Sequence, residues 1–164
     1  MGTERCIYTF IMTRDPNTLE AKTRQVAAGC SCGNLRRASR AVTQLYDGVL
    51  QPSGLKVTQF TLLVAAAQLK AAPVSRMAEV LVMDRTTLTR NLKPLVKDGL
   101  LAVEPGEDRR SRWIRLTPKG RKALAEALPL WDRAQNRVIQ GLGRARWQRL
   151  IGDLKAAVTL TRDR

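Results

Sequence analysis

The sequence predicts a mainly α-helical protein with a small β-hairpin wing, a winged helix-turn-helix module placed between terminal helices. Three observations support this fold class. Apolar residues recur at helical spacing along most of the chain. A short helix with a basic outer face is followed directly by two short strands around a polar loop. The formal net charge is +15, from 29 basic and 14 acidic residues, and it favours a polyanionic partner such as nucleic acid.

The short basic helix is predicted over residues 84–98. Asp84 is expected to cap its start and Gly99 to follow its end. Its predicted buried stripe consists of Leu88, Leu92, Leu95 and Val96. The outward positions carry hydroxyl and basic side chains. Pro94 removes one backbone hydrogen bond, to the carbonyl of Arg90, and should kink the helix beyond its first turns.

The hairpin is predicted from two strands, residues 100–104 and 113–116, with a polar loop over residues 105–111. Arginine is concentrated at the loop, and Thr117 with Pro118 signals the start of the next helix. A basic helix followed by a basic hairpin suits a DNA duplex. The helix can enter the major groove while the hairpin reaches the minor groove or the backbone.

These residues resemble the MarR family of winged helix-turn-helix transcriptional regulators. The resemblance is carried by residues 84–90 and 97–101, and by a wing pattern D-x-R … L-T-x-x-G that Asp108-Arg109-Arg110 and Leu116-Thr117-Pro118-Lys119-Gly120 match. It extends from about residue 35 to the C-terminus. It implies a homodimer, most often a repressor, that reads a pseudo-palindromic operator. It also implies that Arg110 enters the minor groove.

The predicted DNA contacts fall on the basic helix and the wing. Arginine can pair bidentately with guanine, and threonine can bond a phosphate or touch a thymine methyl group. Narrow A·T-rich minor grooves attract arginine, and Asp108 is expected to orient Arg110. The alternative is an ordinary solvated polar surface. The full predicted set is Thr86, Thr87, Thr89, Arg90, Lys93, Arg109, Arg110 and Arg112.

The remaining chain is predicted to flank this module. Residues 1–14 form an N-terminal extension, 15–50 and 118–164 form dimerisation helices, and 51–117 form the DNA-binding module. Asp15 and Pro16 are expected to start the first helix, which glycines interrupt near residues 29–33. Within the module, Thr58 is expected to cap a helix over 59–69 and Ser75 one over 74–81. The last helix, residues 144–161, should place Trp147, Leu150 and Leu154 at or near a subunit interface.

The chain has three cysteines and no histidine. The absence of histidine excludes histidine-based triads and general bases, and no phosphate loop or nucleophile–base pair stands out, so an enzyme is not predicted. Cys30 and Cys32, with Cys6, are candidate thiol sensors or ligands for a soft metal or metalloid; the alternative is simple packing. Thiols two residues apart on a helix point about 200° apart.

A further candidate is a pocket for a small aromatic effector between Tyr46, Trp131 and Trp147, with core packing as the alternative. No cofactor is required by any motif. No apolar run reaches membrane-spanning length and no signal peptide is evident, so a reducing cytoplasm and no membrane partner are expected. The competing function is an architectural or non-specific DNA-binding protein without an effector.

Overall fold

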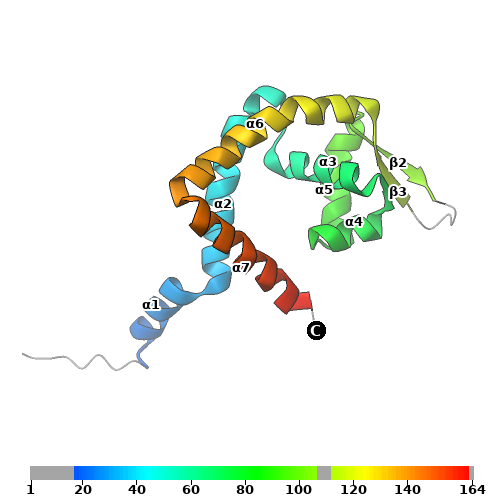
Figure 1. Cartoon of the computed structure of the whole chain (residues 1–164). Coiled ribbons are helices and arrows are strands. Elements are labelled where there is room, and N and C mark those ends of the chain that lie inside the picture. Colours follow the sequence, from blue (N-terminus) through cyan, green and yellow to red (C-terminus); the bar gives the residue numbers. More distant parts are fainter. Residues whose placement is uncertain (1–16, 107–111, 163–164) are drawn as a thin grey trace, which may run out of the picture. The chain divides into compact units, whose positions relative to one another are not determined.

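The structure, a computed structural model, describes residues 17–106 and 112–162 (Figure 1). The chain forms two compact units, residues 1–41 and 42–164. The predicted fold class is confirmed: the described chain is mostly helical and has one small antiparallel sheet. Among the described residues, no helix is long and apolar enough to cross a bilayer.

The first unit contains α1 (Leu19–Gly29) and the start of α2 (Ser31–Leu50). The side chain of Thr18 caps α1 by accepting a hydrogen bond from the backbone N–H of Ala21 at 3.2 Å. The expected start at Asp15 and Pro16 lies outside the described residues. The predicted interruption is confirmed at Cys30, whose extended backbone separates the two helices (φ −66°, ψ 109°).

The second unit contains the rest of α2 and all later elements. These are η1 (Gln51–Ser53), α3 (Val57–Leu69), β1 (Ala71–Pro73), α4 (Val74–Leu81), α5 (Arg85–Lys97), β2 (Leu101–Pro105), β3 (Arg112–Leu116), α6 (Pro118–Leu142) and α7 (Arg144–Arg162). The three strands lie in the order β1-β3-β2, and both pairings are antiparallel. The β2–β3 hairpin is the predicted wing.

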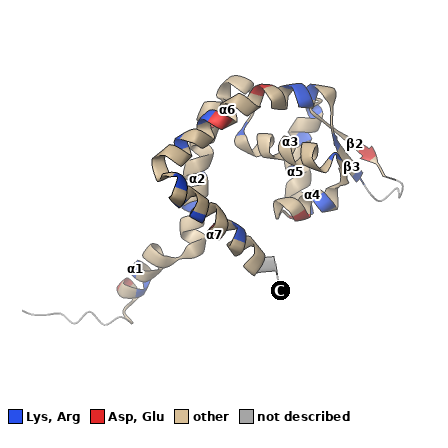
Figure 2. Ribbon diagram, in the orientation of Figure 1, with Lys and Arg blue, Asp and Glu red and all other residues tan. Residues whose placement is uncertain are grey.

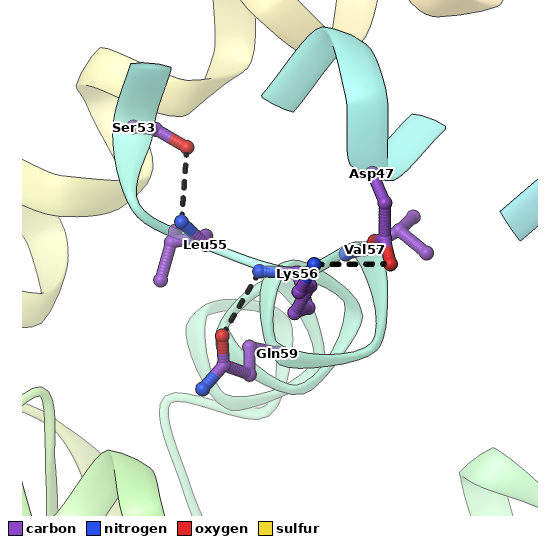
Figure 3. Close-up of polar contacts among 6 residues, drawn as sticks. All are labelled: Asp47, Ser53, Leu55, Lys56, Val57 and Gln59. Carbon is purple, nitrogen blue, oxygen red and sulfur yellow. Dashed lines mark hydrogen bonds and ion pairs between the residues drawn. The ribbon is translucent and has the colours of Figure 1, made fainter. Parts of the chain in front are cut away.

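The start of α3 differs from the prediction, and Thr58 is not its cap. The helix begins at Val57, whose N–H donates to Asp47 Oδ1 at 2.7 Å, while Gln59 Oε1 accepts from the N–H of Lys56 at 2.9 Å (Figure 3). Asp47 belongs to α2, ten residues earlier. A carboxylate from another element therefore accepts a free backbone N–H at the start of α3. A search of the neighbouring sequence for a serine or threonine cap cannot find such an acceptor.

The strand β1 was not predicted, and the predicted cap Ser75 is wrong. Pro73 ends β1 and precedes α4 directly, so no side chain caps α4. Ala72 pairs with Ile114 of β3. Three residues of sequence Ala-Ala-Pro are too short to show the alternation that marks a strand. The pairing with β3 gives the wing a third strand and fixes it to the helix-turn-helix.

The core of the second unit lies between α2, α3, α5, α6 and the sheet. Leu50, Leu63, Leu88 and Leu95 are completely buried. The predicted stripe of α5 is confirmed for Leu88, Leu92 and Leu95. The predicted burial of Val96 is wrong, because 38% of its surface is exposed. The buried positions recur at intervals of four and three residues, and residue 96 falls on the flank of that face.

The long helix α6 joins the module to α7. It continues to Leu142, and Gly143 (φ 78°) separates it from α7. On its inner side the ring of Trp131 stacks on Phe60 at a centroid distance of 6.2 Å. This contact packs α6 against α3.

Candidate nucleic-acid interface

The helix-turn-helix is formed by α4 and α5, and the turn between them is built by two local features. Val82 ends α4 in the left-handed conformation (φ 53°), an uncommon state for a β-branched residue. Asp84 then begins α5, with its Oδ1 accepting the N–H of Thr87 at 2.8 Å, as predicted. The turn therefore fixes the direction in which the recognition helix, α5, leaves α4.

The outer face of the recognition helix presents most of the predicted contacts to solvent. Thr86, Arg90 and Lys93 are exposed, and Thr87 is half-buried beside the cap. Thr89 is exposed, but its hydroxyl donates to the carbonyl of Arg85 at 2.7 Å. Because the hydroxyl proton of Thr89 is already donated within the helix, its methyl group is the more suitable part of the side chain for contacting DNA.

The structure brings the recognition helix and the base of the wing together. Thr89 and Lys93 of α5 and Arg112 of β3 line one recess of about 460 Å³, with Lys97 at the same rim and Val103 in its wall. Arg109 and Arg110 lie outside the described residues. Basic side chains predominate over acidic ones along the ribbon of this unit (Figure 2). Two elements therefore bring three basic side chains, Lys93, Lys97 and Arg112, to one recess whose other lining residues, apart from Thr89, are apolar.

The end of the recognition helix is held by the residues that begin α6. Thr117 Oγ1 donates to the carbonyl of Gly99 at 2.7 Å and accepts the N–H of Gly120 at 2.9 Å. Lys119 Nζ donates to the carbonyl of Asp98 at 2.8 Å. The sequence alone did not indicate this role for Lys119. A lysine at a helix C-terminus satisfies a free carbonyl and complements the helix dipole.

Two of the three aromatic residues singled out from the sequence for an effector pocket, Tyr46 and Trp131, pack in or against the core. Tyr46 is buried, its hydroxyl donates to Gln135 Oε1 at 2.6 Å, and burial raises its pKa. Trp131 stacks on Phe60, while Trp147 lies half-buried on α7. The packing alternative therefore accounts for Tyr46 and Trp131.

The described cysteines lie at the junction of α1 and α2. Cys30 is half-buried and Cys32 exposed, and Cys6 lies outside the described residues. Cys30 Sγ accepts the N–H of Gly33 at 3.4 Å and so takes the place of an N-cap oxygen for α2. Because Cys30 is not helical, the expected divergence of two thiols on one helix does not apply. Within residues 17–106 and 112–162, no group of three potential metal ligands occurs.

Asp84 gives the recognition helix a pH-dependent stability. Hydrogen bonds from Thr87 lower the pKa of this carboxyl from 3.8. Since the folded pKa lies below the unfolded one, the carboxylate stabilises the fold above pH 3.8 and this contribution is lost as the pH falls through the folded pKa. Urea unfolding of wild type and Asp84→Ala, from about pH 6 to about pH 2.5, should therefore show a constant difference that shrinks only in acid. Asp84→Asn is the control, because asparagine keeps a hydrogen-bond acceptor but does not titrate. A difference in stability between wild type and Asp84→Ala that persists unchanged in acid would contradict the assignment.

Comparisons with known proteins agree with this geometry. The profile described as the MarR family matches residues 55–111. The transcriptional regulator MosR of M. tuberculosis, solved in complex with DNA, is 41% identical, with a TM-score of 0.72 over 82% of this chain and 99% of that one. The transcriptional repressor CouR, bound to a 23-mer DNA duplex, is 26% identical, with a TM-score of 0.73 over 82% and 95%.

The comparison with curated proteins gives the same class of relative. The HTH-type transcriptional regulator Hpr of Geobacillus sp. (strain WCH70) is 31% identical over 93 residues, which are 56% of this chain and 46% of that protein. The match thus spans about half the length of the curated relatives. All three proteins are described as transcriptional regulators or repressors, as the sequence resemblance predicted. The chain belongs to the MarR family of transcriptional regulators.

Proposed function

We propose that this protein is a sequence-specific DNA-binding transcriptional regulator that acts as a homodimer on a pseudo-palindromic operator. The main observation behind the proposal is that the recognition helix and the base of the wing bring basic side chains to one recess, which Lys93, Lys97 and Arg112 line together. A helix of this kind fits the major groove, and the adjoining hairpin reaches the neighbouring groove or backbone. MosR and CouR, which share the fold, were solved with DNA bound.

The dimer is supported by apolar surface that the single chain leaves uncovered. On α7, Leu150, Leu154 and Val158 are each about 40% exposed along one stripe. Such contiguous apolar surface marks an interface more often than a free surface. A twofold dimer would present two recognition helices roughly 34 Å apart, one turn of DNA, and would therefore read an inverted repeat.

The experiment that tests this function is selection of bound fragments from genomic DNA, followed by affinity measurements at physiological salt. A specific regulator should bind its selected site at least about 1,000-fold more tightly than random DNA. The competing function, an architectural protein, uses the same surface but lacks this ratio. A ratio near one would reject the regulator, because net charge alone gives non-specific affinity.

The wing arginine gives a sharper prediction. Arg110→Ala should weaken operator binding by on the order of 1–3 kcal/mol, most strongly where the flanks are A·T-rich, because the narrow groove there attracts arginine. Fluorescence anisotropy with A·T-rich and G·C-rich flanks measures the difference. Lys122→Ala, an exposed position on α6 outside the predicted interface, removes the same charge and is the control. Equal losses on both flanks would assign Arg110 only a general electrostatic role.

We further propose that release from DNA, and hence repression and its relief, is controlled by a small effector or by modification of Cys30 and Cys32. Support comes from their position at the junction of two helices, where Cys30 Sγ is the hydrogen-bond acceptor at the start of α2. A disulfide formed on oxidation, or a bound soft metalloid, engages the sulfur and moves it, so that the acceptor is lost from the start of α2. Loss of an N-cap acceptor weakens the first turn of a helix, which provides a local structural response.

The thiol proposal predicts a specific loss of response. Hydrogen peroxide or arsenite should release DNA from wild type, whereas Cys30→Ser/Cys32→Ser should bind DNA normally and stay bound. Serine at residue 30 still accepts the N–H of Gly33, so the variant keeps its helix cap. Amide exchange at residues 29–33 should increase only in treated wild type. A double variant that still responds fully would show that the cysteines are packing residues.

A further inference from the structure

The end of α2 and the start of α3 are joined by a side chain that spans the turn between them (Figure 3). Asp47 of α2 accepts the N–H of Val57, the first residue of α3, through Oδ1 at 2.7 Å. Its other oxygen lies 3.8 Å from Nζ of Lys56, whose side chain is 69% exposed. The short hydrogen bond is therefore the stronger part of this contact, because an exposed ion pair contributes little.

A lysine stands at the N-cap position of α3, where serine, threonine, aspartate or asparagine normally accepts an N–H of the first turn. An ammonium group has no acceptor, so Lys56 cannot do this. Gln59 accepts the N–H of Lys56. Val57 takes its acceptor from α2, and the carboxylate also complements the positive end of the α3 dipole. The start of α3 is thus stabilised only while the end of α2 stays beside it.

The turn between the two helices has hydrogen bonds of its own. Ser53 donates its hydroxyl to the carbonyl of Leu50 at 2.7 Å and accepts the N–H of Leu55 at 3.3 Å. Gly54 takes the left-handed conformation that reverses the chain (φ 71°). These bonds order the turn itself, whereas the bond from Asp47 spans the turn and ties one helix to the other.

The residue next to Asp47 makes a similar contact to a different element. The Tyr46 hydroxyl donates to Gln135 of α6 at 2.6 Å. Consecutive residues of α2 therefore bond α3 and α6. The bond from Tyr46 ends on a helix of the proposed dimer, but the bond from Asp47 ends on α3, which packs against α4 and α5 of the helix-turn-helix. Asp47 thus acts on the element that supports the recognition helix.

We propose that Asp47 is a positioning residue for operator binding: it sets the angle between the end of α2 and the DNA-binding module, and so the half-site spacing that the dimer accepts. The inference rests on the proposed function, in which α2 belongs to the dimer and two recognition helices lie one DNA turn apart. In that dimer, a change of the α2–α3 angle in each subunit moves both recognition helices. Without the bond from Asp47, this angle is less restricted and several spacings become acceptable.

Operators with altered spacing test the proposal. Moving one half-site by one base pair turns it by about 35° around the duplex, since one turn holds about 10 base pairs. Wild type should prefer one spacing by roughly tenfold over its neighbours, and Asp47→Ala should reduce this preference to about twofold or less, with affinity for a single half-site near that of wild type. Asp47→Asn keeps an acceptor for Val57 and should keep the preference. Lys56→Gln removes the ion pair alone and should keep it too.

Two further variants separate positioning from simple stabilisation. Tyr46→Phe removes the hydrogen bond of the adjacent residue and is the matched control, because it should lower stability without changing the preferred spacing. Asp47→Ala/Lys56→Ser gives α3 a serine cap within its own first turn. This double variant should regain stability but still accept several spacings. If it regains the wild-type spacing preference, Asp47 only caps α3, and the proposal is wrong.

Residual dipolar couplings of backbone amides measure the α2–α3 angle without DNA. Residues 42–50 and 57–69 should fit one alignment tensor in wild type and Asp47→Asn, but not in Asp47→Ala/Lys56→Ser. One tensor in every variant would overturn the proposal. An unchanged spacing preference in Asp47→Ala, with wild type behaving as expected, would reject this role alone. A wild type that accepts all spacings equally would reject the proposed twofold dimer, and this role with it.

Discussion

Gly120→Ala should destabilise the DNA-binding module by roughly 3 kcal/mol and lower the midpoint of thermal unfolding by on the order of 10 °C. A methyl group at residue 120 would overlap the carbonyl oxygen of Leu100 and lie 2.7 Å from Leu116 Cδ1. That carbonyl accepts the N–H of Thr117 at 3.2 Å. Since the obstructing atom is hydrogen-bonded backbone, it cannot move aside as a flexible side chain would.

Gly141→Ala is the matched control for this prediction. Residue 141 lies in the same helix, and a methyl group there would meet nothing within 4 Å. Alanine favours the helix, so this variant should gain roughly 0.5–1 kcal/mol. Urea unfolding measures both changes. Equal responses of the two variants would show that the contact between α6 and Leu100 does not constrain the fold.

The same contact joins the end of the recognition helix to the start of α6. Thr117 and Lys119 each bond a carbonyl at the end of the recognition helix, and Gly120 allows the close approach. A rotation of α6 would therefore carry the recognition helix with it. Gly120→Ala should lower DNA affinity as well as stability, because it disturbs the support of the helix proposed to contact DNA.

The recognition helix could be predicted from sequence because its signals are local. Asp84 caps it, Gly99 follows it with φ 70°, and Leu88, Leu92 and Leu95 repeat at helical spacing. The features that were missed depend on residues distant in sequence. Asp47 caps a helix ten residues later, and β1 exists only because β3 lies beside it. Neither relation leaves a periodic pattern.

The candidate sites divide in the same way. The basic and hydroxyl side chains of the recognition helix could be named from sequence, but not the recess that joins Thr89 with Arg112. Lys70 and Arg121 are 51 positions apart by numbering and line one recess only because α3 and α6 pack together. Alanines carry no functional signal in a sequence, although Ala66, Ala67 and Ala125 line that recess. The charged residues of a site can therefore be predicted from the sequence, whereas the recess that they line is known only from the folded structure.

Leu150→Asp should abolish the proposed dimer and cause the largest loss in DNA affinity among these variants. Leu150 is 41% exposed and shares one stripe of α7 with Leu154 and Val158. In a dimer that buries this stripe, an aspartate would be desolvated without a partner. A cost of roughly 3 kcal/mol or more follows, which corresponds to a change of more than about 100-fold in the dimerisation constant.

Sedimentation at micromolar concentration and binding to operators with one or two half-sites measure this effect together. Leu150→Asp should sediment as a monomer and lose the advantage of the second half-site, while its affinity for a single half-site should stay near that of wild type. Ala156→Asp adds the same charge to α7, but helical periodicity places it opposite the stripe. It should remain dimeric. If both variants dissociate, assembly is weakened by added charge on α7 and not by loss of the apolar stripe. If wild type is itself a monomer, the twofold arrangement is wrong, because one recognition helix must then supply all of the operator affinity.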